Sequence, residues 1–331
     1  MNERRYRLPA EWELQSAVQL TWPHPGTDWA PILDDVLRVY REMAREIAKR
    51  ETLIVVAPEG VDVDAGVEAV IMRCPTNDTW ARDHAFITLS AEENPRDHCF
   101  VDFCFNGWGE KFAASLDNAI NGELFRQGVV KGAYRDCLDF VLEGGSIESD
   151  GRGTVLTTSH CLMAPHRNQP MTQSQIEQRL KRELGADRIL WLDYGLLEGD
   201  DTDGHIDTLA RLAPNDTILY IYDDGSPELR QMEQQIAGFR TIDGRPYRLL
   251  RLPVPRPLFD NEGQQLPATY ANFLVVNGAV LCPTYSQPDL DNEALRIIGK
   301  AFPDREIVGI DCRPLVWQHG SLHCCTMQYP Q

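Results

Sequence analysis

Apolar residues recur at helical spacing in five segments of the chain, with polar positions on the opposite faces. In residues 31–49 one such stripe consists of Ile32, Val36, Tyr40, Met43 and Ile47. The five predicted helices cover residues 31–49, 114–127, 173–184, a segment that begins after Ser226, and 290–302. Thr172 and Gln175 have capping-box spacing before the third helix, and Gly185 is placed to end it.

Short β-type runs lie between these helices and predict strands. Runs rich in β-branched and apolar residues cover residues 52–56, 154–158, 217–221 and 273–276, and alternating runs cover 100–104 and 206–212. Strands and a single helix therefore alternate five times along the chain, which predicts an internal structural repeat. A doubly wound sheet is the alternative, but no glycine-rich turn of the nucleotide-binding type joins a strand to a helix.

The composition is that of an ordinary globular protein, with 331 residues, of which 43% are hydrophobic and 25% charged. No segment is apolar for long enough to span a bilayer, and the first residues do not resemble a secretory signal peptide. No linker divides the chain, so we expect one domain over residues 1–331. The nine cysteines show no repeated spacing, which predicts free thiols and a cytoplasmic location.

The charge excludes some classes of partner. The chain has 32 Lys and Arg against 50 Asp and Glu, a formal charge of −18. Such a surface repels phosphate, so we expect neither nucleic acid nor an anionic membrane as a partner. It is compatible with a small cationic ligand, although solubility alone would also explain it.

Four short segments combine acidic, histidine or cysteine residues with glycine or an aromatic residue: 77–83, 142–146, 203–207 and 320–326. His205 and Asp207 are two residues apart on a strand-like run, so we expect their side chains on one face. A histidine beside a carboxylate suits general acid–base catalysis, and a cysteine thiolate is a strong nucleophile. Additional carboxylates suit a guanidinium group, whose paired N–H donors match carboxylate oxygens. The combination indicates attack of a thiolate on a guanidinium carbon.

Each segment also has a simpler explanation. Glu143-Gly144-Gly145 fits a turn, Arg82-Asp83 fits a surface ion pair, and Trp80 fits a core position. His323-Cys324-Cys325 lacks the second pair of ligands that a zinc site needs, so we expect no metal.

Read in order, these segments resemble the agmatine deiminase and bacterial-type peptidyl-arginine deiminase family of the guanidino-modifying (pentein) superfamily. The family patterns W-x-R-D, E-G-G, G-H-x-D and H-C correspond to Trp80–Asp83, Glu143–Gly145, Gly204–Asp207 and His323-Cys324. The resemblance extends from Leu8 to Pro330. It implies an α/β fold, a five-bladed pseudo-fivefold propeller of ββαβ units with the active site in its central channel.

The resemblance also implies roles for individual residues. Cys324 would attack the guanidinium carbon, and His205 would protonate the departing ammonia and then activate water. Asp83 and Asp207 would hold the guanidinium nitrogens, and Glu143 would bind one of them or orient His205.

Other residues would form the walls of the pocket. Trp80 would stack on the planar cation, while Trp22 and Gly204 would contribute to substrate binding. No metal or organic cofactor is implied. Cys325 adjoins the nucleophile, and since neighbours on a strand face opposite ways, the family position selects Cys324.

The implied reaction converts agmatine and water to N-carbamoylputrescine and ammonia through a covalent thiouronium on Cys324. Arginine and peptidyl-arginine are alternative substrates, and a non-catalytic guanidine- or polyamine-binding protein is an alternative class. The partner would be a small cationic guanidino compound, and the resemblance is compatible with a homo-oligomer.

Overall fold

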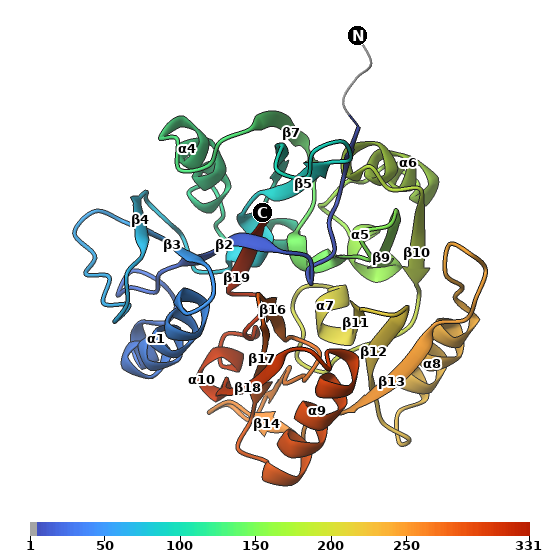
Figure 1. The fold of residues 1–331 in the computed structure, drawn as a ribbon. Coiled ribbons are helices and arrows are strands. Elements are labelled where there is room, and N and C mark those ends of the chain that lie inside the picture. The colour runs from blue at the N-terminus through green and yellow to red at the C-terminus, as the bar shows by residue number, and fades with distance from the viewer. Residues whose placement is uncertain (1–4) are drawn as a thin grey trace.

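A computed structural model describes residues 5–331, and within them the strands form five sheets of three or four strands and one two-stranded hairpin. Figure 1 shows these sheets arranged around a common centre, with the longer helices toward the outside. The first two sheets contain β1 (Tyr6–Arg7), β5 (Ile87–Ala91), β6 (His98–Cys104) and β7 (Ala133–Val141), then β8 (Ile147–Ser149), β9 (Thr154–Thr158) and β10 (Arg188–Leu192). The next two contain β11 (Ala210–Ala213), β12 (Thr217–Tyr222) and β13 (Arg248–Pro253), then β16 (Leu274–Val276), β17 (Ala279–Thr284) and β18 (Glu306–Asp311). The fifth contains β19 (Thr326–Pro330), β2 (Gln15–Thr21), β3 (Thr52–Ala57) and β4 (Val70–Arg73), and the hairpin pairs β14 (Leu258–Phe259) with β15 (Gln265–Leu266).

One pairing pattern recurs in all five sheets: an antiparallel pair is followed by a parallel pair. A helix connects the parallel strands each time, because such strands need a long crossover. These helices are α1 (Leu33–Ala48), α4 (Ile120–Arg126), α6 (Gln173–Leu184), α8 (Pro227–Gly238) and α9 (Pro288–Ala301). The strand–helix repeat predicted from the sequence is therefore present.

The two ends of the chain share the fifth sheet. Strand β19 pairs antiparallel with β2, with Thr326 opposite Leu20. This pairing fixes the turn that carries Cys324, which directly precedes β19, against the N-terminal part of the chain.

The predicted helices are present, with different lengths in places. The capping box of Thr172 and Gln175 forms at the start of α6, and Gly185 ends that helix with a left-handed φ of 65°. Residues 114–127 are less helical than predicted, with a 3-10 turn η2 (Asp117–Ala119) before the short α4.

The prediction of one strand over residues 206–212 is wrong. Residues Ile206–Leu209 form the helical turn α7, and only Ala210–Ala213 form a strand, β11. Side chains close this turn, because the Thr208 hydroxyl donates to the carbonyl of His205 and the Thr202 hydroxyl accepts from its N–H. His205 and Asp207 therefore do not share a strand face.

The remaining short helices are α2 (Ala81–His84), α3 (Gly107–Glu110), α5 (Ser159–Leu162), α10 (Arg313–Val316) and the 3-10 turns η1 (Ala30–Ile32) and η3 (Gly144–Ser146). None of the helices in residues 5–331 is long and apolar enough to cross a membrane.

Candidate active site

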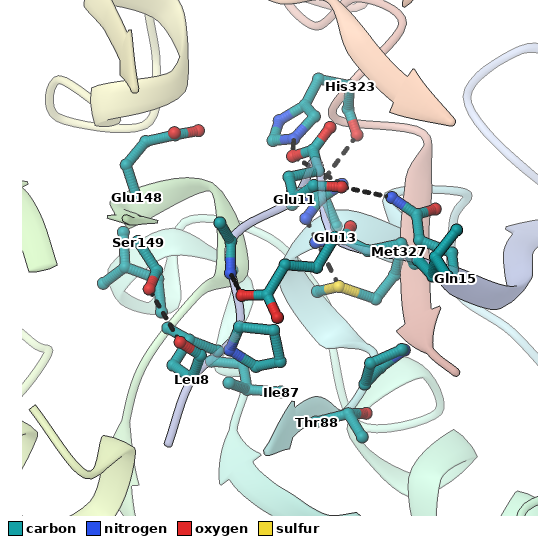
Figure 2. Close-up of a pocket in the computed structure, with 18 residues that line it drawn as sticks. Leu8, Glu11, Glu13, Gln15, Ile87, Thr88, Glu148, Ser149, His323 and Met327 are labelled. Carbon is teal, nitrogen blue, oxygen red and sulfur yellow. Dashed lines mark hydrogen bonds and ion pairs between the residues drawn. The ribbon is translucent and has the colours of Figure 1, made fainter. Parts of the chain in front are cut away.

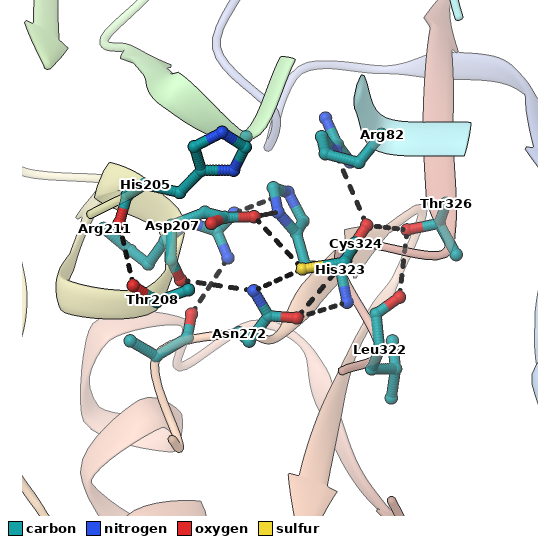
Figure 3. Close-up of polar contacts among 12 residues, drawn as sticks. Arg82, His205, Asp207, Thr208, Arg211, Asn272, Leu322, His323, Cys324 and Thr326 are labelled. Carbon is teal, nitrogen blue, oxygen red and sulfur yellow. Dashed lines mark hydrogen bonds and ion pairs between the residues drawn. The ribbon is translucent and has the colours of Figure 1, made fainter. Parts of the chain in front are cut away.

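The four polar segments singled out from the sequence meet near the centre of the molecule. They lie on α2, on η3, on α7 and on the turn before β19, and η3 contacts both α2 and α7. Figure 3 shows the polar contacts around Cys324 and Asp207. Segments between residues 80 and 324 thus supply one cluster of side chains.

Asp83 is buried and held by two donors. The indole N–H of Trp108 donates to its Oδ2 (3.0 Å), and the backbone N–H of Gly145 donates to its Oδ1 (3.0 Å). Burial raises the pKa of Asp83, while the positive charge of His205 acts in the opposite direction. The carboxylate is therefore fixed in place and electrostatically coupled to His205.

His205 is fully buried, and neither of its ring nitrogens has a hydrogen-bond partner. Its Nδ1 lies 3.7 Å from Oδ1 of Asp83. Burial alone would lower the pKa of His205, but the Asp83 carboxylate, assisted by Cys161 and Glu143, raises it well above its ordinary value. A protonated imidazole of this kind can act as a general acid.

Gly145 is required by the close packing of this centre. A Cβ at this position would lie 2.6 Å from Nδ1 of His205, 2.9 Å from Oδ1 of Asp83 and 3.2 Å from Oδ2 of Asp207. All three side chains therefore converge on the backbone of one glycine, and any side chain there would displace them.

Cys324 faces the same carboxylates. The amide N–H of Asn272 donates to its Sγ (3.3 Å), and Oδ2 of Asp207 lies 3.9 Å from the sulfur. Burial, followed by the charges of Asp207 and Asp83, raises the pKa of Cys324 well above its ordinary value. Burial and the two carboxylates therefore favour the neutral thiol over the thiolate.

Cys324 and Cys325 lie in a turn and not on a strand, so strand alternation does not separate them as predicted. They nevertheless have different surroundings. Cys324 lines a cavity, whereas Cys325 is fully buried beside Tyr40, and burial raises its pKa to about 12.

The cavity at Cys324 has a volume of about 190 Å³ and an acidic lining. Trp80, Asp83 and Trp108 are buried and line it together with Cys324. The other lining residues are Asp28, Asp78, Phe112, Asp201, Thr202, Thr208, Gln318, His319 and Gly320. Asp28 is exposed and Asp78 and Asp201 are half-buried, so aspartates mark the open end and the thiol lies at the closed end.

Two of these aspartates titrate near neutral pH. Burial and the nearby charge of Asp28 raise the pKa of Asp78 to about 7. Burial raises the pKa of Asp201 to about 6, although His319 acts against this shift.

The residues that line the cavity include neither the buried His205 and Asp207 nor Glu143 and Gly204. Both oxygens of Glu143 accept from Nε of Arg167 (3.0 and 3.2 Å), and Arg167 also binds the carbonyl of Thr202 and the carboxylate of Asp203. Gly204 has a left-handed φ of 88°. Both residues therefore shape the loop that leads into His205.

Trp22 is also outside the cavity lining. It is almost fully buried, and its ring packs edge-on against Tyr40 with centroids 5.7 Å apart. The structure thus places it in the core, whereas Trp80, which packs against Trp29 and Trp108, borders the cavity.

Several residues that contact the site were not identified from the sequence. Asn272, Trp108 and Asp201 lie outside the four segments singled out from the sequence, and no spacing rule connects them to Cys324. Only the fold brings them together.

Two groups of side chains in residues 5–331 lie close enough together to hold a metal ion: Glu143 with Cys161 and His205, and Glu11 with Glu148 and His323. In both groups the carboxylates already pair with an arginine, Arg167 in the first and Arg211 in the second. A metal ion at either place would therefore face a guanidinium charge.

Comparisons with known proteins agree with this chemistry. The model of the family described as Porphyromonas-type peptidyl-arginine deiminase matches residues 7–330. An agmatine deiminase of Medicago truncatula is 30% identical, over 98% of this chain and 96% of the relative.

Solved structures match over nearly the whole chain as well. A substrate-bound variant of agmatine deiminase from C. jejuni is 35% identical, with a TM-score of 0.92 over 100% of this chain and 98% of that one. A Porphyromonas gingivalis protein provisionally named an arginine deiminase is 49% identical, with a TM-score of 0.91 over 99% of both chains. This chain is a hydrolase that acts on carbon–nitrogen bonds, and it belongs to the Porphyromonas-type peptidyl-arginine deiminase family.

Proposed function

We propose that this protein hydrolyses agmatine to N-carbamoylputrescine and ammonia. The observation that carries this proposal is the charge of the cavity: a thiol and Asp83 lie at its closed end, and Asp28, Asp78 and Asp201 lie toward its open end. No arginine or lysine is among the residues of the described chain that line it. Agmatine has a cationic group at each end, which matches aspartates at both ends of the cavity.

The guanidinium group would satisfy atoms that now lack partners. Oδ1 of Asp207 is buried without a hydrogen-bond donor, and Asp83 lies beside it. N–H groups of the substrate would donate to these carboxylates and hold the carbon near Sγ of Cys324. The substrate's positive charge would also stabilise the thiolate, offsetting the two carboxylates that now disfavour it.

The chemistry then proceeds in two stages. Sγ bonds to the guanidinium carbon, the C–N bond to one amino group breaks, and His205 protonates that group as it leaves. In net terms the amino group departs as ammonium with the thiol proton and the proton from His205, which leaves a cationic thiouronium and a neutral His205. Water, deprotonated by His205, attacks the same carbon, and the C–S bond breaks to release the ureido product and the thiol.

The alternative substrates are arginine and peptidyl-arginine, and the names of the family and of the P. gingivalis relative favour them. Free arginine and C-terminal peptidyl-arginine carry a carboxylate. The aspartates at the open end would repel it, and no cationic Arg or Lys of the described lining would bind it. A non-catalytic guanidine-binding protein would not need Cys324 and His205 together, and this chain has both.

Ammonia release from agmatine, arginine and a peptide with C-terminal arginine, measured under the same conditions, tests the substrate. We expect agmatine to have a kcat/KM at least about 100-fold above the others, because a mispaired charge costs several kcal/mol. Equal turnover of agmatine and arginine would overturn the choice of substrate. No turnover of any guanidino compound would overturn the proposed activity.

We also propose that the five repeated sheets form the blades of a pentein propeller and that residues 1–331 act as one catalytic domain. The recurring pairing pattern and the convergence of distant segments on Cys324 support both proposals.

A further inference from the structure

A network of buried charged side chains adjoins the site, and the reaction described above does not use it. Its members are Glu11, Arg82, Glu148, Arg211 and His323, none of which is more than 9% exposed. Glu11 and His323 line a second cavity of about 60 Å³, distinct from the one that Cys324 lines (Figure 2). Burying so many charges is costly, so their arrangement requires a physical reason.

His323 connects this network to Asp207. Its Nδ1 lies 2.7 Å from Oδ2 of Asp207, and its Nε2 lies 2.7 Å from Oε2 of Glu11. A nitrogen and a carboxylate oxygen approach this closely only when a hydrogen lies between them. Each of these two contacts is therefore a hydrogen bond, and Nη2 of Arg211 lies 3.1 Å from the same Nε2. His323 thus bridges Asp207 and Glu11.

Glu11 is held rigidly although it belongs to the N-terminal segment. Nη2 of Arg211 donates to its Oε2 (2.8 Å), and the backbone N–H of Val275 donates to its Oε1 (2.7 Å). Arg211 in turn donates to the carbonyls of Ala271 and Phe273 and stacks on the Phe273 ring. Glu11 therefore presents a fixed oxygen to His323.

The consequence appears at Asp207. His323 occupies its Oδ2, and the buried Oδ1 is left without a donor. Resting on the proposed function, we propose that His323 and Glu11 are positioning residues, which fix Asp207 so that its free oxygen accepts from the guanidinium group. Burial would raise the pKa of Asp207, but the hydrogen bond from His323 holds it below its ordinary value.

Two substitutions at His323 separate this role from simple packing. His323→Asn keeps an N–H near the position of Nδ1 and loses the contact with Glu11. His323→Gln places its amide near the position of Nε2 and loses the bond to Asp207. We expect kcat/KM for agmatine to fall at least about tenfold further in His323→Gln than in His323→Asn, at similar urea midpoints. Equal losses, or losses that follow the unfolding midpoint, would overturn the positioning role.

Glu11→Gln tests the part of the network farther from Asp207. We expect it to lower kcat/KM for agmatine by less than His323→Gln does, because His323 keeps its bond to Asp207 but loses its charged partner. Glu13→Gln is the matched control, since Glu13 lines the same cavity but pairs with Arg7, and it should match the unaltered protein.

An unchanged kcat/KM in Glu11→Gln would overturn the positioning role of Glu11 and leave the proposed deiminase reaction intact. Failure of the unaltered protein to release ammonia from any guanidino compound would overturn the proposed function instead.

Discussion

At the scale of single residues, the two adjacent cysteines are both buried but have different surroundings. Cys324 faces Asn272 and Asp207 at the end of a cavity, and Cys325 lies in the core beside Tyr40. Both pKa values are raised by burial, so acidity alone does not identify the nucleophile. The difference that identifies Cys324 is its position in the cavity, where a substrate cation could reach it.

Substitution of each cysteine by serine gives a direct comparison. Cys324→Ser should lower kcat by several orders of magnitude while the protein still folds, because the hydroxyl is a far weaker nucleophile. Cys325→Ser should retain most of the activity, with a modest loss of stability. Steady-state ammonia release and thermal unfolding of both variants measure this, and a reversed order would show that the nucleophile is assigned to the wrong residue.

The candidate catalytic residues can be located from the sequence, whereas most of the residues that contact them cannot. Motifs located Cys324, His205, Asp83 and Asp207, and the structure brings them together. Glu11 was not predicted, because it lies 312 positions from the histidine it contacts. No local pattern encodes a contact between the two ends of a chain.

At the scale of elements, helix ends were predicted correctly where they depend only on residues close in the sequence. The capping box and the glycine end of α6 were predicted correctly, since both depend on neighbouring residues. The alternating pattern of residues 206–212 predicted a strand, but residues 206–209 form α7, which is buried on all sides. Hydrogen bonds that the Thr202 and Thr208 side chains make with the backbone of His205 close this helical turn. Burial on all sides removes the one-sided pattern on which such predictions depend.

The end of α6 yields a stability prediction. Gly185 has a positive φ, and a Cβ there would lie 1.9 Å from the carbonyl oxygen of Tyr6 in β1. Gly128 also has a positive φ, 70°, but a Cβ there would meet nothing within 4 Å. We expect Gly128→Ala to cost about 1 kcal/mol of unfolding free energy from backbone strain alone. Gly185→Ala should cost about 2–4 kcal/mol, because β1 must also move.

The unfolding free energies of the two variants, measured in urea, separate the cost of backbone strain from the cost of the contact between the new Cβ and β1. Equal losses would mean that β1 adjusts freely and that its contact with the end of α6 contributes nothing.

At the scale of the whole molecule, part of the negative charge lies where a cation would bind, because four aspartates line the cavity at Cys324. Asp78 and Asp201 ionise near pH 7 and pH 6. Their raised pKa values mean that they are neutral in acid and become negative as the pH rises through this range. The attraction for a distal ammonium group therefore increases with pH.

Agmatine binding to the Cys324→Ser variant, which avoids turnover, tests this by calorimetry. We expect the Kd to fall by about two- to fivefold per carboxylate between about pH 5.5 and pH 8, the effect of a partly exposed ion pair. Asp78→Asn should remove the part of the change near pH 7. A Kd that is constant or rises over this range would contradict the assignment of these aspartates to the substrate's distal end.

The central claim is that the sulfur of Cys324 bonds to the guanidinium carbon of agmatine. The most direct test is the intact mass of the enzyme after acid quenching during steady-state turnover, with peptide mapping of the modified residue. We predict a species heavier by agmatine less ammonia, located on Cys324, present in Cys325→Ser and absent in Cys324→Ser. Turnover of agmatine with no such adduct, or with the adduct on another cysteine, would contradict the claim.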